Sequence, residues 1–271
     1  MMYTLDKKLT IIKYGSNTLV HANVHDSISI DYNTIYDHGS IINAYDGPII
    51  IVSSGAVALG KTINQFAEVD NEVIRKRMCA SLGNPHLSMN RSKAIPDKYI
   101  LQGLITHRDL SLPDTKKSLK EMIYHTYQTS DKNIILVNDN DFISDEELKK
   151  IRGGNFGDND RLTTLLAELC DEIFTEVNVI INTSTDGVLD GTTTIPKLDT
   201  DALTDAYIEK LCGTGKTSLG TGGMNNKLKI LRDLVSTHKN IQAHIINGKH
   251  PIQLKNTLAG KHNGTKIYIA Q

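Results

Sequence analysis

Three short, almost purely apolar runs constrain the fold most strongly. They are Pro48–Val52 (PIIIV), Asn133–Val137 (NIILV) and Val177–Ile181 (VNVII). A strand that is apolar along both faces is typical of a parallel sheet that helices cover on both sides. Helix-like segments separate these runs, as in a series of βαβ units. The sequence therefore predicts an α/β fold with a mainly parallel central sheet.

The remaining elements follow the same alternation. Further strands are expected at Leu9–Ile12, Tyr99–Thr106, Ile241–Ile246 and Lys266–Ala270, and helices at Tyr32–Ala44, Thr115–Tyr127, Arg161–Cys170 and Asn225–Ser236. Gly83 predicts a break between two helices, Val73–Leu82 and Pro85–Ala94. No linker interrupts the chain, so we expect one domain over residues 1–271.

Composition excludes several classes of protein. The formal net charge of the 271 residues is −1 and Trp is absent, which argues against a nucleic-acid partner. The three cysteines share no CxxC spacing and indicate free thiols in a reducing compartment. No apolar run reaches the length of a membrane span, and the first residues do not resemble a signal peptide. We therefore expect a cytoplasmic protein without a membrane partner.

Small and polar residues follow nearly every expected strand. The sequences are KYGS after the first strand, SSGA after PIIIV, NDND after NIILV and NTSTDG after VNVII. In open α/β sheets, ligands bind outside the carboxyl ends of the strands, although turns there also need small residues. Four such loops favour a shared site.

The stretch Gly154–Leu166 (GNFGDNDRLTTLL) adds Asp158, Asn159 and Asp160 at an expected helix start. One helix cap needs a single such side chain, so the surplus fits either ligand contacts or an ordinary capped turn.

Two lysines and three glycine-bearing loops indicate an anion site. Gly15-Ser16, Ser54-Gly55-Ala56 and Gly220–Met224 can each present backbone N–H groups to a phosphate, or can simply be surface loops. Lys13 ends the first strand, and Lys227 lies in a first helical turn, where a cation opposes the helix dipole. Cations, anion-binding loops and acids together describe a phosphoryl-transfer site.

Other familiar site patterns are not completed at the loops that could carry them. The stretch Gly213–Thr217 (GTGKT) does not complete GxxxxGK[ST], because Lys210 stands where that motif needs Gly. No GxGxxG follows the first strand, and no GxSxG surrounds Ser54. The ten histidines form no HExxH pair, so we assign no metal site to protein side chains.

Taken together, these loops resemble the amino-acid kinase superfamily and, within it, the glutamate 5-kinase branch. The matching motifs, in the family's order, are Lys13–Leu19 (KYGSNTL), Val52–Gly60 (VSSGAVALG), Asn138–Asp141 (NDND), Gly157–Asp160 (GDND), Asn182–Leu189 (NTSTDGVL) and Gly220–Lys227 (GTGGMNNK). The resemblance implies an open three-layer αβα sandwich. It also implies a substrate lobe at about residues 1–170 and a nucleotide lobe at about 171–271. Many family members carry a C-terminal PUA domain, and we expect none here because the sequence ends at Gln271, soon after the kinase region.

The activity that the resemblance implies is transfer of the ATP γ-phosphoryl group, with Mg²⁺, to the side-chain carboxylate of L-glutamate. This is the first step of proline biosynthesis. The family also implies a homo-oligomer, a dimer or a tetramer. The residues implied are catalytic Lys13, Lys227, Asp158 and Asp160; glutamate-binding Ser54, Gly55, Asn138, Asp141 and Asn159; and ATP-binding Lys13, Gly15, Ser16, Thr183, Ser184, Thr221, Gly222, Gly223, Met224 and Lys227.

Three departures from the family pattern keep alternatives open. Asp139 stands where the family has Glu, Ser184 where it usually has Asp, and Lys76–Asn84 replaces a stretch that lies near glutamate in the family. One alternative is a sister kinase acting on another carboxylate, on carbamate or on a phosphate acceptor. The other is a non-catalytic protein of the same fold that senses nucleotides or amino acids.

Overall fold

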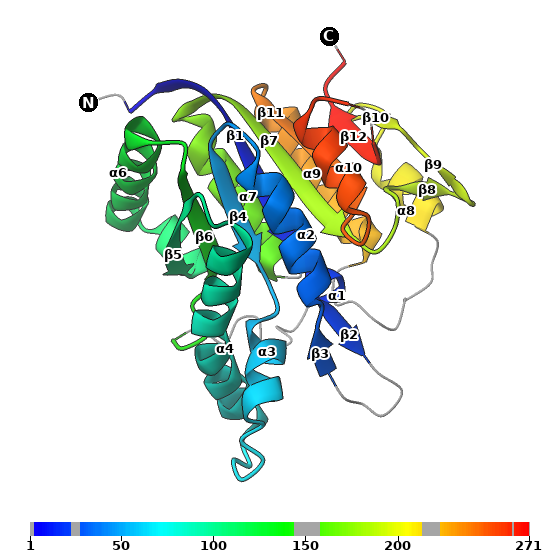
Figure 1. Ribbon diagram of the computed structural model, residues 1–271. Coiled ribbons are helices and arrows are strands. Elements are labelled where there is room, and N and C mark those ends of the chain that lie inside the picture. Colours follow the sequence, from blue (N-terminus) through cyan, green and yellow to red (C-terminus); the bar gives the residue numbers. More distant parts are fainter. Residues whose placement is uncertain (1–2, 23–27, 144–157, 213–222, 262, 271) are drawn as a thin grey trace.

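The central sheet has eight strands. The structure, a computed structural model, describes residues 3–22, 28–143, 158–212, 223–261 and 263–270. The strands of the sheet are β1 (Leu5–Tyr14), β4 (Ile49–Ser53), β5 (Tyr99–Ile105), β6 (Asn133–Asp139), β7 (Phe174–Thr183), β10 (Lys197–Asp199), β11 (Ile241–Asn247) and β12 (Thr265–Tyr268). Their order is β10-β12-β11-β7-β1-β4-β6-β5, as Figure 1 shows. All neighbours pair in parallel except β11 and β12. A mainly parallel sheet was expected.

The described helices are α1 (Ser16–Leu19), α2 (Tyr32–Asn43), α3 (Ala56–Ile63), α4 (Glu72–Ala94), α5 (His107–Ser111), α6 (Pro113–Thr129), α7 (Asp158–Asp171), α8 (Asp205–Cys212), α9 (Met224–Thr237) and α10 (Pro251–Leu258). Two small hairpins complete the described elements: β2 (Val20–Ala22) with β3 (Ile28–Ile30), and β8 (Leu189–Asp190) with β9 (Thr193–Thr194). No described helix has the length and apolar character needed to cross a membrane.

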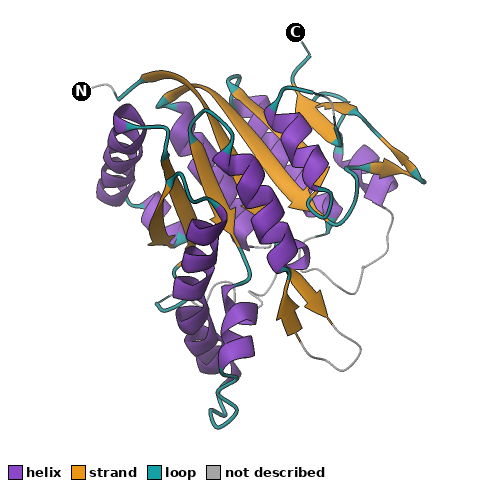
Figure 2. Ribbon diagram, in the orientation of Figure 1, coloured by secondary structure: helices purple, strands orange, loops and turns teal. Residues whose placement is uncertain are grey.

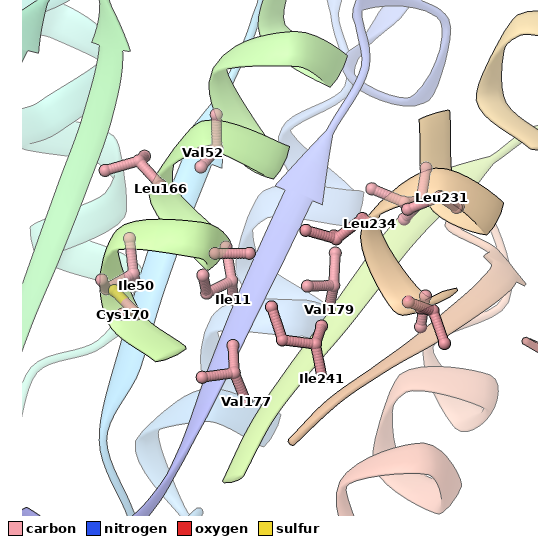
Figure 3. Packing of buried hydrophobic residues seen from close by; sticks show 14 of the residues in the cluster. Ile11, Ile50, Val52, Leu166, Cys170, Val177, Val179, Leu231, Leu234 and Ile241 are labelled. Carbon is pink, nitrogen blue, oxygen red and sulfur yellow. The ribbon is translucent and has the colours of Figure 1, made fainter. Parts of the chain in front are cut away.

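Helices cover both faces of the sheet (Figure 2). On one face, residues such as Ile11 and Val179 pack against Leu166 of α7 and Leu234 of α9 (Figure 3). On the other face, residues such as Ile12 pack with side chains of α2, α3, α4 and α10. The three-layer αβα sandwich predicted from the sequence is therefore confirmed.

The strand β1 separates these two cores residue by residue. Successive side chains of a strand point to opposite faces. Ile11 lies in the core beneath α7 and α9, whereas Ile12 and Tyr14 lie in the core beneath α2 and α4. Lys13 lies on the same face of β1 as Ile11, so its side chain points toward α7.

The predicted helix break at Gly83 is wrong, because α4 runs without interruption through Gly83 and Pro85. Gly83 serves packing instead. A Cβ on Gly83 would lie 1.9 Å from the Ala56 carbonyl oxygen, and one on Gly60 would lie 1.8 Å from the Cys79 carbonyl oxygen. The two glycines let α3 and α4 meet backbone to backbone. This tertiary contact outweighs the local cost of Gly and Pro within a helix.

The predicted strands of the central sheet end within four residues of the observed bounds. The edge strand β10, the two small hairpins and the shorter helices α1, α3, α5, α8 and α10 were not predicted. The sheet is continuous across the expected lobe boundary, because β1 pairs with β7 as well as with β4. The division into lobes stays a prediction.

Candidate active site

The carboxyl ends of five parallel strands meet at one edge of the sheet. Tyr14 of β1 lies opposite Ser53 of β4 and Asn182 of β7 in the ladder. Asn138 is the last residue but one of the strand β6, which neighbours β4, and Asn247 pairs with the last residue of β7. The loops after these strands therefore lie side by side, as the strand-end pattern predicted.

Three charged side chains converge at this edge. Asp160 Oδ1 lies 2.5 Å from Lys13 Nζ, and Asp160 Oδ2 lies 3.1 Å from Lys227 Nζ. The side chains of Asp160 and Lys13 are 6% and 7% exposed, so this contact is shielded from bulk water. Lys227 is more open at 17%. One carboxylate thus holds two ammonium groups from β1 and α9, elements far apart in the chain.

The charge balance of this cluster fixes the ionisation of Asp160. Burial alone raises the pKa of its carboxyl group, but the two neighbouring lysines outweigh that effect and leave the pKa below its ordinary value of 3.8. Asp160 also lies in the first turn of α7, where the helix dipole favours a negative charge. Lys227 lies in the first turn of α9, where the dipole opposes it, and Asp160 offsets that cost.

The backbone beside Lys13 is shaped for its ammonium group. A Cβ on Gly15 would lie 3.3 Å from Lys13 Nζ, so glycine leaves room for Lys13 to pass. Asn182 donates from Nδ2 to the Lys13 carbonyl oxygen at 3.0 Å and ties the end of β1 to β7.

A cavity of about 180 Å³ lies beside this cluster. Its lining residues come from the carboxyl end of β6, from the residues that follow β1, β4 and β6, and from α3. They are Ser16, Ser54, Gly55, Ala56, Val57, Ala58, Lys61, Asn138 and Asp141. Four predicted glutamate-binding residues are among them. Ser16, which we expected to bind ATP, lies on the wall of this same cavity.

The cavity offers binding groups for both signs of charge. Gly55 adopts a left-handed conformation (φ 102°) and starts α3, whose first turn has no acidic residue and no side-chain cap. The N–H groups of that turn lack intrahelical partners and suit an anion, as does Lys61 one turn further on. Asp141 is buried on the lining and suits a cation.

Buried asparagine side chains form hydrogen bonds to residues that line the cavity. Asn159 donates from Nδ2 to Ser54 Oγ at 2.8 Å. Asn138 donates from Nδ2 to Asn84 Oδ1 at 2.8 Å. Asn84 and Lys61 were missed at the sequence level. Val57 and Lys61 are four residues apart and therefore share one face of a helix. This signal could be used only if the helix α3 had been predicted, and it was not.

The predicted ATP-binding residues are only partly described. Thr221 and Gly222 lie outside the described residues. Gly223 starts α9 without a side-chain cap, and Met224 follows it. The Thr183 hydroxyl donates to the Ile246 carbonyl oxygen at 3.1 Å. Ser184, the next residue, is exposed.

Asp158 begins α7, but only its backbone is described, so its predicted role stays a prediction. Within the described residues there is no group of three or more His, Cys, Asp and Glu side chains that is suited to a metal ion. Cys79, Cys170 and Cys212 are free thiols.

Comparison with known proteins places this geometry in a family. Residues 8–247 match the model of the amino acid kinase family. The chain is 26% identical to a glutamate 5-kinase of Ligilactobacillus salivarius and 27% identical to one of Clostridium perfringens, covering 97–98% of this chain and 97% of each relative. A glutamate 5-kinase of Pasteurella multocida is 27% identical, over 70% of its own length.

Solved structures agree on the fold alone. A carbamate kinase from Giardia lamblia has a TM-score of 0.61 at 15% identity, covering 98% of this chain and 99% of that one. An isopentenyl phosphate kinase has a TM-score of 0.57 at 16% identity, covering 96% and 100%. From the match to the family model over most of its length, we conclude that the chain belongs to the amino acid kinase family.

Proposed function

We propose that the protein transfers the γ-phosphoryl group of ATP to the side-chain carboxylate of L-glutamate, forming L-glutamyl 5-phosphate for proline biosynthesis. The observation that carries this proposal is the cluster of Lys13, Asp160 and Lys227 beside a cavity with groups for both charges. The glutamate 5-kinase relatives support the choice of acceptor.

The proposed chemistry needs no proton transfer. A carboxylate oxygen of glutamate attacks the γ-phosphorus, the bond from that phosphorus to the β–γ bridging oxygen breaks, and ADP leaves. Negative charge spreads over the oxygens of the transferring group, and Lys13 and Lys227 neutralise it. Asp160 keeps both ammonium groups at fixed positions, so they need not reorganise during the transfer.

Nucleotide binding is assigned to the loops that surround the lysines. The uncapped first turn of α9, which begins at Gly223, suits the phosphates of ATP, as does the backbone at Gly15. Thr183, Ser184, Thr221, Gly222 and Met224 complete the proposed contacts. Mg²⁺ belongs to the proposal as a partner of the nucleotide phosphates, where it would neutralise negative charge.

The cavity favours an amino acid over the other acceptors of the superfamily. An amino acid carries an ammonium group and a carboxylate, which match Asp141 on one side and Lys61 with the start of α3 on the other. Carbamate and phosphate acceptors carry no ammonium group, and Asp141 would repel their negative charge. This match supports an amino-acid acceptor over carbamate or a phosphate acceptor, and the glutamate 5-kinase relatives support glutamate among the amino acids.

The test measures ADP release and trapping of an acyl phosphate by hydroxylamine in parallel. We expect ADP release that depends on both ATP and glutamate, with an equal yield of glutamyl hydroxamate. ADP release with carbamate, isopentenyl phosphate or UMP but not with glutamate would show a sister kinase. If the protein bound ATP or glutamate but released no ADP with any of these acceptors, it would be a sensing protein, and the proposal would be overturned.

The proposal also includes a cytoplasmic location and assembly into a dimer or a tetramer. The buried free thiols Cys79 and Cys170 fit a reducing compartment. Sedimentation analysis of the purified protein measures the assembly, and a monomer at all concentrations would remove this part of the proposal.

A further inference from the structure

Asn84 lies in the middle of α4 and does not line the acceptor cavity. Its side chain is nevertheless buried, with 3% of the residue exposed. Oδ1 of Asn84 accepts a hydrogen bond from Asn138 Nδ2 at 2.8 Å. Gly83, the preceding residue, allows the close approach of α4 to α3 that brings Asn84 to this position.

An amide has a donor end and an acceptor end, so one hydrogen bond orients the whole group. With Nδ2 of Asn138 directed to Asn84, Oδ1 of Asn138 accepts from the backbone N–H of Asp139 at 3.0 Å. The same oxygen lies 3.5 Å from Asn159 Nδ2. The donor end of Asn159 therefore points toward Asn138 and Ser54.

The acceptor end of Asn159 is left over. Asn159 is only 3% exposed, and its Oδ1 has no hydrogen-bond partner among the described residues. A buried acceptor without a donor is costly, which indicates a ligand donor in the working complex. Asn159 adjoins the cavity through its bond to Ser54, and the amino-acid acceptor proposed for that cavity carries an ammonium group.

We propose that Asn84 is a positioning residue that fixes the amide orientation of Asn138 and, through it, of Asn159, so that an oxygen is presented to the ammonium group of the acceptor. Without the oxygen of Asn84, Asn138 is free to turn over. Its NH₂ group would then face two other donors, Asp139 N–H and Asn159 Nδ2. The identity of the acceptor in this inference rests on the proposed function.

The kinetic test uses three variants. Asn84→Leu keeps the size but removes the oxygen, and Asn84→Asp keeps an oxygen in place. The control Asn133→Leu removes a half-buried amide that donates to the Thr126 carbonyl oxygen at the other end of β6. We expect Asn84→Leu to raise the KM for glutamate about tenfold without changing the KM for ATP. Asn84→Asp restores the KM, and Asn133→Leu leaves it unchanged.

A second measurement needs no substrate. The side-chain NH₂ signals of Asn138 and Asn159 in the free ¹⁵N-labelled protein are expected to move in Asn84→Leu and not in Asn133→Leu. Asn84→Ala gives the same result without added bulk if the leucine variant does not fold. Unmoved signals, or an unchanged KM for glutamate, would overturn the inference. If the native protein does not phosphorylate glutamate, the proposed function fails and the NMR signals decide the inference alone.

Discussion

Lys13 and Tyr14 are neighbours on β1 but belong to two different regions. On one face, Lys13 joins Asp160 and Lys227 in a cluster where each charge has an opposite charge within 3.1 Å. On the other face, the Tyr14 hydroxyl and His38 Nδ1 form a hydrogen bond of 2.9 Å, and the Arg91 guanidinium lies 4.1 Å from the centre of the Tyr14 ring. Both regions are buried, but they handle charge in different ways.

The region around Tyr14 keeps His38 and Tyr14 neutral instead of pairing opposite charges. Burial, together with the nearby Arg91, lowers the pKa of His38 to about 3, against a small opposing effect of Asp31. Burial raises the pKa of Tyr14 to about 12. Among the described residues, no carboxylate forms a salt bridge with Arg91, which relies on the Tyr14 ring. The contrast agrees with a β1 strand whose Lys13 face serves the proposed reaction and whose Tyr14 face supports the structure.

The largest expected effect is on turnover. Lys227→Ala removes one of the two cations at the proposed transferring phosphoryl group and should lower kcat by about 10²–10³-fold. The control is Lys229→Ala, two residues further along α9. Among the described residues it removes only long surface contacts of 3.9 and 3.8 Å to Asp205 and Glu209. Its kcat should stay close to that of the native protein. Equal losses in both variants would remove Lys227 from its proposed role.

The second prediction concerns the stability of the paired region. Asp160→Asn leaves Lys13 and Lys227 without their shared counter-charge and should lower the free energy of unfolding by about 3 kcal/mol at pH 7. Because the folded-state pKa of Asp160 lies below its ordinary value, its contribution is complete above about pH 4 and is lost as the pH falls. Urea unfolding of both proteins should therefore show a gap that narrows toward low pH. A constant gap would contradict the pairing.

The third prediction concerns the region that suppresses charge. In the folded protein His38 stays neutral down to about pH 3, whereas in the unfolded chain it takes up a proton below about pH 6.5. The unfolded state therefore binds the extra proton, and stability is lost as the pH falls between these two values. Between pH 7.5 and 5 this amounts to about 2 kcal/mol. Urea unfolding at both pH values should show that loss in the native protein, and His38→Gln should lack it. The same loss in both would show that other groups cause it.

The smallest effect tests whether the two faces are independent. Tyr14→Phe removes the hydroxyl that bonds His38 but keeps the ring beneath Arg91. We expect the free energy of unfolding to fall by about 1 kcal/mol and kcat to stay unchanged. Thermal unfolding and the ADP-release assay measure the two quantities. A loss of kcat comparable to that of Lys227→Ala would show that both faces of β1 serve the reaction.

Local sequence was sufficient for the fold class and for much of the candidate site. A continuous apolar run such as the one ending at Val52 predicts a strand that is buried on both faces. The hydrophobicity behind this prediction is a property of the residues themselves. The polar residues after those runs, among them Ser54 and Asn138, mark the carboxyl edge of any parallel sheet. Lys13, Asp160 and Lys227 stood out because their charges and positions at element ends are visible in the sequence.

Only the tertiary structure decided which of these groups touch. The contact of Asp160 with both lysines joins β1, α7 and α9, and no spacing along the chain encodes it. From the local sequence, Gly83 predicts a helix break. In the structure it permits the backbone contact of α4 with α3 that brings Asn84 within hydrogen-bond distance of Asn138. Residue type and period determined the layers, because burial is a local preference. Packing between distant segments determined the pairing of charges and amides, because those contacts form only when the layers close.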